Sequence, residues 1–291
     1  MLAGQLAEDE LTQPRKHPVV SAVVPCAMPE VSVVMPCYCA AATVGETIDS
    51  VLAQTARPLE LIAVDDASTD GTAQVLEGKQ RACGADWLRI VRLPLNRGVA
   101  SARNAGWAAA RGEFVAFVDS DETWHPRKVE IQHAFMRGHP EIAISAHRSA
   151  RSARGAEPAQ VPDNPTVRYP PAWSLLLWNP FGVRSVMLRR DLPYRFLEGR
   201  RHMEDHLLWM TMALRGERIA FLDAPLARIH KAPYGASGLS ADLWLMEKGD
   251  LDNYRLLHRD GLISLPAMAG LQALSLAKFA KRLAVTSVRR G

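Results

Sequence analysis

Hydrophobic and polar positions follow one repeating order in the first part of the chain. Short apolar runs, rich in β-branched and aromatic residues, cover 31–35, 59–64, 87–93 and 114–118. Runs of this kind are typical of strands buried in a parallel sheet. The stretches between them carry apolar positions at helical spacing, which predicts intervening helices. This alternation predicts an α/β fold with a mostly parallel central sheet and helices on both faces.

Local signals set the first element boundaries. Pro36 predicts the end of the first strand, because proline cannot donate to a β-ladder. Thr43 and Glu46 have the spacing of a capping box, which predicts the start of the first helix.

The pattern changes after residue 144. Residues 148–172 are rich in arginine, alanine and proline and predict an irregular segment. Three further elements are expected: a strand at 183–188, a helix at 203–214 and a strand at 219–229. Asp223-Ala-Pro225 interrupts the last of these strands.

These changes divide the chain into three parts. Residues 1–29 mix charges, prolines and small residues without a period, so we expect a flexible leader. Residues 30–240 form the α/β domain, with one half at 30–125 and a second at 126–240. Residues 241–291 predict a helical C-terminal extension.

The last expected helix, after Pro266, is amphipathic. It places these residues on two sides: Leu276, Phe279 and Leu283 on one, and Lys278, Lys281 and Arg282 on the other. A helix that packs on the domain explains this pattern, and so does peripheral contact with an anionic membrane.

Two acidic clusters fall at the ends of expected strands. Asp65-Asp66 ends the second strand, and Asp119-x-Asp121 follows the fourth. Ligands of parallel α/β sheets bind beyond the carboxyl ends of the strands, and hard divalent cations prefer oxygen ligands. Each cluster alone is also typical of a solvated turn or a helix N-cap. Together they favour a nucleotide and cation site at one rim of the sheet.

Two later positions carry further candidate chemistry. Glu204-Asp205 starts a helix, where carboxylates are favoured by the helix dipole; Asp205 could also serve as a general base on a rigid element. His230 ends a later strand and could be structural or a metal ligand.

Composition narrows the class of function. The net charge of +4 favours anionic partners but is too small to indicate nucleic-acid binding. The four cysteines form neither a disulfide framework nor a zinc motif, which favours reduced thiols in the cytoplasm. No apolar run approaches the roughly 18 residues of a membrane span.

A series of motifs runs in a fixed order from about Val31 to Ser240. The motifs are Val31-Ser-Val-Val-Met-Pro36 with Tyr38, Val64-Asp-Asp-Ala-Ser-Thr-Asp-Gly-Thr72, Asn96-Arg-Gly-Val-Ala-Ser-Ala-Arg-Asn-Ala-Gly106, Gly112-Glu-Phe-Val-Ala-Phe-Val-Asp-Ser-Asp121, Pro126-x-Lys128, Glu204-Asp205 and His230. In this order they resemble family 2 of the glycosyltransferases, the large inverting family with the GT-A fold. Cys39 and Glu122 depart from the family, which usually has Asn and a third Asp there.

The resemblance implies a Rossmann-like GT-A domain and a role for each matching position. The implied nucleotide-sugar site comprises Pro36, Tyr38, Asp66, Arg97, Arg103, Asn104, Asp119 and Ser120. Within it Asp66 would contact the base, and Asp119 the ribose or the diphosphate. Asp121 and His230 would hold Mn²⁺ or Mg²⁺, and Asp205 would be the catalytic base.

The implied activity is metal-dependent transfer of a sugar from a nucleotide-diphosphate sugar to a hydroxyl acceptor, with inversion. A UDP-sugar is the expected donor, and a saccharide or lipid-linked saccharide of cell-surface polysaccharide or glycolipid assembly is the expected acceptor. The expected location is the cytoplasm or the inner face of the membrane. Two alternatives stay open: a sugar nucleotidyltransferase, although no glycine-rich loop precedes Gly45, and a non-catalytic nucleotide-sugar-binding subunit.

Overall fold

The structure is a computed structural model that describes residues 30–230 and 242–288. The expected leader at 1–29 lies outside the described residues. The strands are β1 (Val31–Cys37), β2 (Glu60–Asp65), β3 (Leu88–Arg92), β4 (Phe114–Phe117), β5 (Thr123–Trp124), β6 (Ile144–Arg151), β7 (Val167–Arg168), β8 (Met187–Arg189) and β9 (Ile219–Ile229). The helices are α1 (Val44–Leu52), α2 (Thr72–Cys83), α3 (Val99–Ala109), α4 (Lys128–Gly138), α5 (Ala172–Leu177), α6 (Glu204–Leu214), α7 (Leu243–Arg259) and α8 (Leu265–Val288), with a 3-10 turn η1 (Val183–Ser185).

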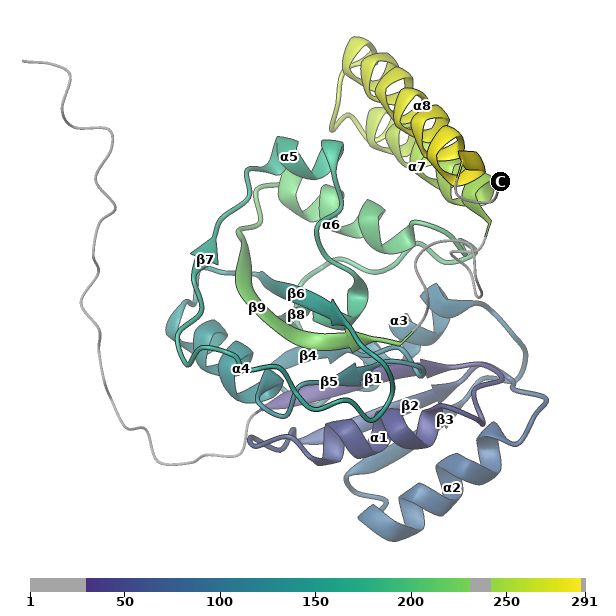
Figure 1. Cartoon of the computed structure of the whole chain (residues 1–291), viewed down its shortest axis with the longest axis vertical. Helices are drawn as coiled ribbons and strands as arrows, with labels where there is room; N and C mark the ends of the chain where they lie inside the picture. The colour runs from purple at the N-terminus through teal and green to yellow at the C-terminus, as the bar shows by residue number, and fades with distance from the viewer. Residues whose placement is uncertain (1–29, 231–241, 289–291) are drawn as a thin grey trace, which may run out of the picture.

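One sheet runs through the domain in the order β3-β2-β1-β4-β8-β6-β9-β5, with β7 beside β9 (Figure 1). The first four strands are parallel, as the sequence predicts. Antiparallel pairing enters with β8, which lies between β4 and β6. The carboxyl ends of β1, β2 and β4 therefore meet at one rim, where the acidic clusters follow.

Both faces of this sheet are covered by helices. Val33 and Met35 of β1 pack in one cluster with α1, α2 and α4, whereas Val34 packs in another with α3 and α6. Alternate residues of a strand point to opposite faces, so an all-apolar strand needs cover on both sides. Gly106 lets α3 approach closely, because a Cβ there would lie 2.4 Å from Cγ1 of Val34.

Pro36 does not end β1, which continues to Cys37. The register shows why proline is tolerated. Pairing with β4 ends at Val34, and Pro36 lies opposite Val64 of β2. The side of Pro36 that faces β4 therefore needs no ladder hydrogen bond.

The second half departs further from the predicted pattern. Arg148–Arg151 belong to β6 rather than to an irregular segment, because β9 pairs along the whole of β6. The predicted interruption of β9 is a bulge: the register shifts at Arg148, opposite Pro225, while the strand itself continues. The expected strand at 183–188 is the turn η1 followed by β8.

The C-terminal extension is a helical pair, α7 and α8, that stands beyond α6 at one end of the molecule (Figure 1). Tyr254 and Leu257 of α7 are buried in the same core cluster as α6. Within residues 30–230 and 242–288, no helix is long and apolar enough to cross a bilayer.

Candidate active site

The loop after β1 is held in place by the turn that follows β2. Three backbone N–H groups of residues 39–41 donate to side-chain oxygens of Ser68, Thr72 and Asp70, at 3.0, 2.8 and 3.1 Å. Tyr38 stands at the start of this loop with 53% of its surface exposed. The polar turn after Asp66 thus holds the backbone that follows Tyr38 and so positions the exposed ring of Tyr38.

Asp66 fixes the entrance to α3. Its Oδ1 accepts a hydrogen bond from the backbone N–H of Arg97 and its Oδ2 from that of Gly98, both at 2.8 Å. The carboxylate is buried. The Arg97 guanidinium reaches away to Glu198, with Nη2 and Oε2 3.0 Å apart. Asp66 and Arg97, both predicted for the nucleotide site, are therefore joined through a backbone contact.

Arg103 of α3 connects the two acidic regions that the sequence singles out. Its Nη2 lies 2.9 Å from Oδ1 of Asp119, and its Nη1 lies 2.6 Å from Oε1 of Glu204. The guanidinium is buried against the ring of Phe196. Burial works against its charge, but Asp119 and Glu204 prevail and raise the pKa of Arg103. One cation therefore holds the end of β4 beside the first turn of α6.

Asp205 follows Glu204 directly in that turn. Its Oδ1 accepts a hydrogen bond of 2.7 Å from the backbone N–H of His206. Burial, and then the charge of Glu204, raise the pKa of Asp205 to about 6, although Arg103 and His206 act in the opposite direction. A carboxylate with this pKa is ionised at neutral pH and remains basic enough to accept a proton.

The turn from Asp119 to Asp121 joins β4 to β5, with Glu122 N–H donating to the Asp119 carbonyl at 3.1 Å. Ser120 lies between the two carboxylates and is partly buried. Glu122 points elsewhere: its Oε1 pairs with Nη1 of Arg184 at 2.7 Å in a largely buried contact. Glu122 is therefore part of the packing beneath the turn.

His230 lies beside β5, next to this turn. Its Nδ1 is 3.1 Å from the carbonyl oxygen of Ser152, and its Nε2 is 2.8 Å from Oγ1 of Thr123. A carbonyl only accepts, so Nδ1 carries the proton and Nε2 accepts from the Thr123 hydroxyl. The lone pair of Nε2 therefore faces the strand that begins two residues after Asp121.

Asn104 contacts the loop before α6, where it also reaches Glu198, the partner of Arg97. Its amide exchanges two hydrogen bonds with the backbone of Phe196, at 2.8 and 3.0 Å. Glu198, two residues further on, accepts from Arg97 and from the Ser101 hydroxyl. No motif in the sequence marks Glu198. Its contact with α3 depends on how the loop before α6 folds, which the sequence pattern does not reveal.

The structure thus gathers most predicted site residues at one rim. Asp119, Arg103 and the Glu204-Asp205 pair are connected by direct contacts, and His230 reaches the same turn through Thr123. Pro36 and Tyr38 lie at the end of β1, and Asp66 at the end of β2. Glu204 is the partner that sequence reasoning treated only as a helix start.

A divalent cation fits this rim if the protein and a bound diphosphate coordinate it together. In the part of the chain that the structure describes, no cluster of three or more Asp, Glu, His or Cys side chains could hold a metal by itself. A cation that takes most of its oxygen ligands from a diphosphate needs only one or two carboxylates. Asp119, Asp121 and Nε2 of His230 are donors of the required chemistry.

Comparison with known families decides the assignment. The profile of "Glycosyl transferase family 2" matches residues 32–192, more than half of the chain. The chain belongs to this family. It is a family 2 glycosyltransferase, and the reading as a sugar nucleotidyltransferase is set aside.

Relatives of this family 2 glycosyltransferase support the assignment over a longer range. EpsE of Bacillus subtilis (strain 168), named as a glycosyltransferase, is 31% identical over 211 residues, which cover 70% of this chain and 73% of EpsE. The Escherichia coli protein WfgD, named UDP-Glc:alpha-D-GlcNAc-diphosphoundecaprenol beta-1,3-glucosyltransferase, is 31% identical over 191 residues, covering 62% and 69%.

The fold of this glycosyltransferase is shared with a solved structure. The mannosyltransferase PcManGT of Pyrobaculum calidifontis, in complex with GDP-Man and Mn²⁺, superposes with a TM-score of 0.63 at 20% identity, over 94% of this chain and 79% of that chain. The GT-A fold expected from the sequence is confirmed.

Proposed function

We propose that this enzyme transfers a sugar from a nucleotide-diphosphate sugar, a UDP-sugar first among the candidates, to a hydroxyl acceptor with inversion at the anomeric carbon. The observation that carries this proposal is the bridge from Asp119 through Arg103 to Glu204. It fixes a candidate donor-binding turn beside Asp205, whose pKa suits a base. Donor and base then act at one rim.

The proposed donor site uses the ends of β1, β2 and β4. The exposed ring of Tyr38 lines the nucleotide, and Asp66 keeps lone pairs for a base or ribose group while it holds the α3 entrance. Asp119 and Ser120 face the ribose and diphosphate. Arg103 acts through Asp119, because its guanidinium is buried between two carboxylates.

Asp121 and His230 are the proposed protein ligands of Mn²⁺ or Mg²⁺. The hydrogen bond from Nδ1 of His230 to the Ser152 carbonyl fixes the tautomer with a lone pair at Nε2, the usual arrangement for a ligating histidine. The Thr123 hydroxyl donates to that lone pair in this structure, so a cation bound at Nε2 would replace the Thr123 contact. A divalent cation bound there would stabilise negative charge on the diphosphate as a Lewis acid. The Mn²⁺ in the PcManGT complex supports this proposal.

The proposed reaction is a single displacement. The ionised carboxylate of Asp205 takes the proton of the acceptor hydroxyl while the acceptor oxygen forms a bond to the anomeric carbon. The bond from that carbon to the diphosphate oxygen breaks, and the nucleoside diphosphate leaves with the electron pair. Attack from the face opposite the leaving group inverts the anomeric centre.

The proposed acceptor is a saccharide, with a lipid-linked saccharide favoured. The name of WfgD gives a diphosphoundecaprenol-linked sugar as its acceptor. In this chain Trp173 on α5 and Trp178 at its end are exposed, and Lys278 of α8 donates to the Leu177 carbonyl next to Trp178 at 2.6 Å. Indole rings next to lysines suit the interface of an anionic bilayer.

The free thiols of Cys37, Cys39 and Cys83 suit a reducing compartment such as the cytoplasm.

Asp205→Asn tests the proposed base. The variant should lose at least about 100-fold in transfer rate, because general-base catalysis is worth about 10²–10⁴-fold. Its affinity for the nucleoside diphosphate should stay unchanged. A panel of UDP-, GDP- and dTDP-sugars with Mn²⁺ or Mg²⁺, scored by diphosphate release with and without saccharide acceptors, supplies the measurement.

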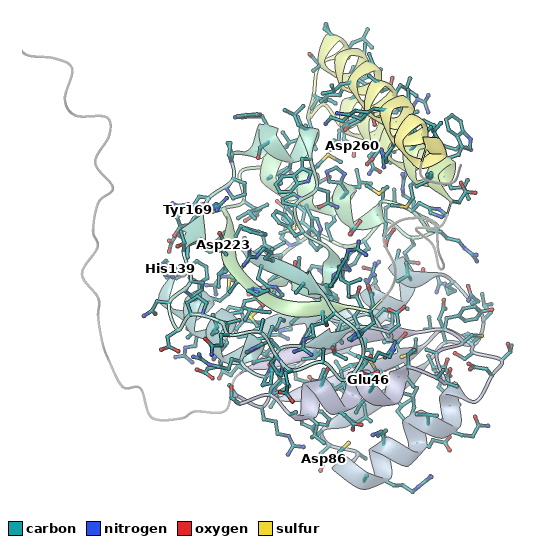
Figure 2. All side chains as sticks on the ribbon, viewed as in Figure 1. Glu46, Asp86, His139, Tyr169, Asp223 and Asp260 are labelled. Atoms are coloured by element: carbon teal, nitrogen blue, oxygen red, sulfur yellow. The ribbon has the colours of Figure 1, made fainter. Side chains whose placement is uncertain are left out.

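Asp86→Asn is the matched control, since Asp86 lies on an exposed turn before β3, away from the rim (Figure 2).

The wild-type rate should rise with pH to a plateau, with half of the maximum near pH 6, because Asp205 must be ionised. Full activity of Asp205→Asn would exclude Asp205 as the base.

A further inference from the structure

His206, the residue after the proposed base, is buried with both ring nitrogens in contact with acceptors. Its Nε2 lies 2.7 Å from the carbonyl oxygen of Leu175, and its Nδ1 lies 3.1 Å from Oδ1 of Asp250 on α7. A carbonyl and an ionised carboxylate accept hydrogen bonds and donate none. Both nitrogens must therefore carry protons, which makes the ring an imidazolium.

The electrostatics of the site agree with this protonation state. Burial alone would lower the pKa of His206, yet the hydrogen bond and charge of Asp250, with smaller help from Asp205, raise it. Asp250 from α7 and Asp205 from α6 are the charged groups that act on the ring. Glu204 and Arg103 act on Asp205, and Asp250 also acts on Arg200 from the preceding loop. The α5 side offers the Leu175 carbonyl.

The face of α7 that carries Asp250 is fitted to the segment before α6. The Asn253 amide donates to the Met203 carbonyl at 2.9 Å, and Arg200 donates to Asn253 and to the Gly249 carbonyl. Met203 has a positive φ of 58°, an unfavourable conformation for this residue type. A Cβ at Gly249 would lie 3.0 Å from the His202 carbonyl oxygen. α7 therefore clamps the turn that presents Glu204 and Asp205.

We propose that Asp250 of the C-terminal extension is a positioning residue for the transfer reaction: it holds His206 as an imidazolium against Asp205. The backbone N–H of His206 donates to Asp205, and the charge of each of these two neighbours on α6 acts on the pKa of the other. The imidazolium keeps the Asp205 carboxylate ionised at lower pH, and α7 thereby becomes part of the active site. This inference rests on the proposed role of Asp205 for its effect on rate.

Asp250→Asn separates the charge from the fold. The Asn amide can donate to a neutral Nδ1, so the ring keeps both of its contacts while the imidazolium is lost. Loss of the neighbouring positive charge should move the acidic limb of the pH–rate profile up by about one unit. With a midpoint that moves from about 6 to about 7, the rate at pH 6 should fall about fivefold and the rate at pH 8.5 should stay the same.

Asp252→Asn is the matched control. It removes the same charge from the same helix, but the Asp252 carboxylate pairs within α7 with Arg255. Its pH profile should coincide with that of the wild type. Asp250→Glu should restore the wild-type midpoint, which a merely structural role of Asp250 would not require.

Nitrogen-15 NMR of the His206 ring tests the charge state without donor or acceptor. We expect both ring nitrogens protonated at pH 7.5 in the wild type, and one protonated in Asp250→Asn. A neutral His206 in the wild type would overturn the inference, even if the enzyme transfers sugar. An imidazolium together with coincident pH profiles of Asp250→Asn and wild type would overturn its link to Asp205.

Discussion

Lys128 is an ionisable residue buried outside the proposed site. Its side chain has no exposed surface, and within the described residues its Nζ has no hydrogen-bond partner. The ammonium lies 3.6 Å from the centroid of the Trp124 ring. Burial lowers the pKa of Lys128 well below its ordinary value, and burial together with the charge of Lys128 lowers that of His147. This buried amine therefore lowers the free energy of unfolding.

Lys128→Met should raise the free energy of unfolding at pH 7 by about 1–3 kcal/mol, the cost of a buried unsatisfied donor. The Lys128 amine binds a proton more tightly in the unfolded chain than in the folded chain. The free energy of unfolding of the wild type therefore rises with pH between the lowered pKa of folded Lys128 and its unfolded pKa of about 10.4. The rise is at most about 1.4 kcal/mol per pH unit. Lys128→Met should lose this slope. Denaturant unfolding from pH 7 to 10 measures it.

Lys79→Met is the control, because the Lys79 ammonium pairs at the surface with Asp49. It should keep the wild-type slope. Parallel pH dependences for Lys128→Met and wild type would show that the ammonium is not desolvated in the folded state.

The sequence could identify site residues but not what each contacts. Asp66 and Asn104 are recognisable from their motifs, yet their side chains hold the Arg97-Gly98 backbone and the Phe196 backbone. Both contacts join segments that are distant in sequence, and no local pattern encodes such pairs. The bridge through Arg103 was invisible for the same reason.

At the scale of elements, α3 shows how composition permits a close contact. The helix is rich in small residues, and Gly106 lies directly against Val34 of β1. This approach places Arg103, three residues earlier, between β4 and α6. The position of α3 therefore affects the site as well as the core.

Gly106→Ala should lower the free energy of unfolding by about 1–3 kcal/mol, because the new methyl group would overlap Val34. Gly138→Ala, at the end of α4, meets no described atom within 4 Å and should be neutral or stabilising by up to about 1 kcal/mol. Thermal and denaturant unfolding compare the two. Equal stabilities would mean that α3 lies further from the sheet.

Elements of the first half were predictable because each carries its own period. The capping box at Thr43 was wrong in detail: the Thr43 side chain caps no N–H, and Glu46, which Figure 2 labels, pairs instead with Arg154. That ion pair joins α1 to residue 154, in the segment predicted to be irregular. The sequence pattern also did not predict α4. Two of its buried positions are the polar residues Lys128 and Gln132, so the helix lacks a continuous apolar face.

At the scale of the whole molecule, α5 presents exposed apolar side chains beside the C-terminal extension. Trp173 and Trp178 are 62% and 67% exposed, and α8 reaches them through Lys278. If this surface meets a bilayer, the two rings should enter the interface and the lysine should lie near the headgroups.

Trp173→Ser with Trp178→Ser should lower partitioning onto vesicles of phosphatidylglycerol and phosphatidylcholine at least about tenfold, because each ring contributes a large apolar area. Leu95→Ser is the control, since Leu95 is 60% exposed before α3. Co-sedimentation measures the bound fraction. Unchanged partitioning of the double variant would remove this surface from the account.

Asp121, after β4, is proposed to bind the cation of the diphosphate, and Asp205 of α6 is proposed to act as the base at the same site. A crystal structure with Mn²⁺ and a nucleoside diphosphate, with the ion located by anomalous scattering, tests this proposal most directly. We predict one Mn²⁺ peak within coordination distance of an Asp121 oxygen, with the diphosphate bound to the ion and Asp205 facing the same cavity. A peak or a nucleotide bound away from this rim, with Asp121 free of metal, would contradict it.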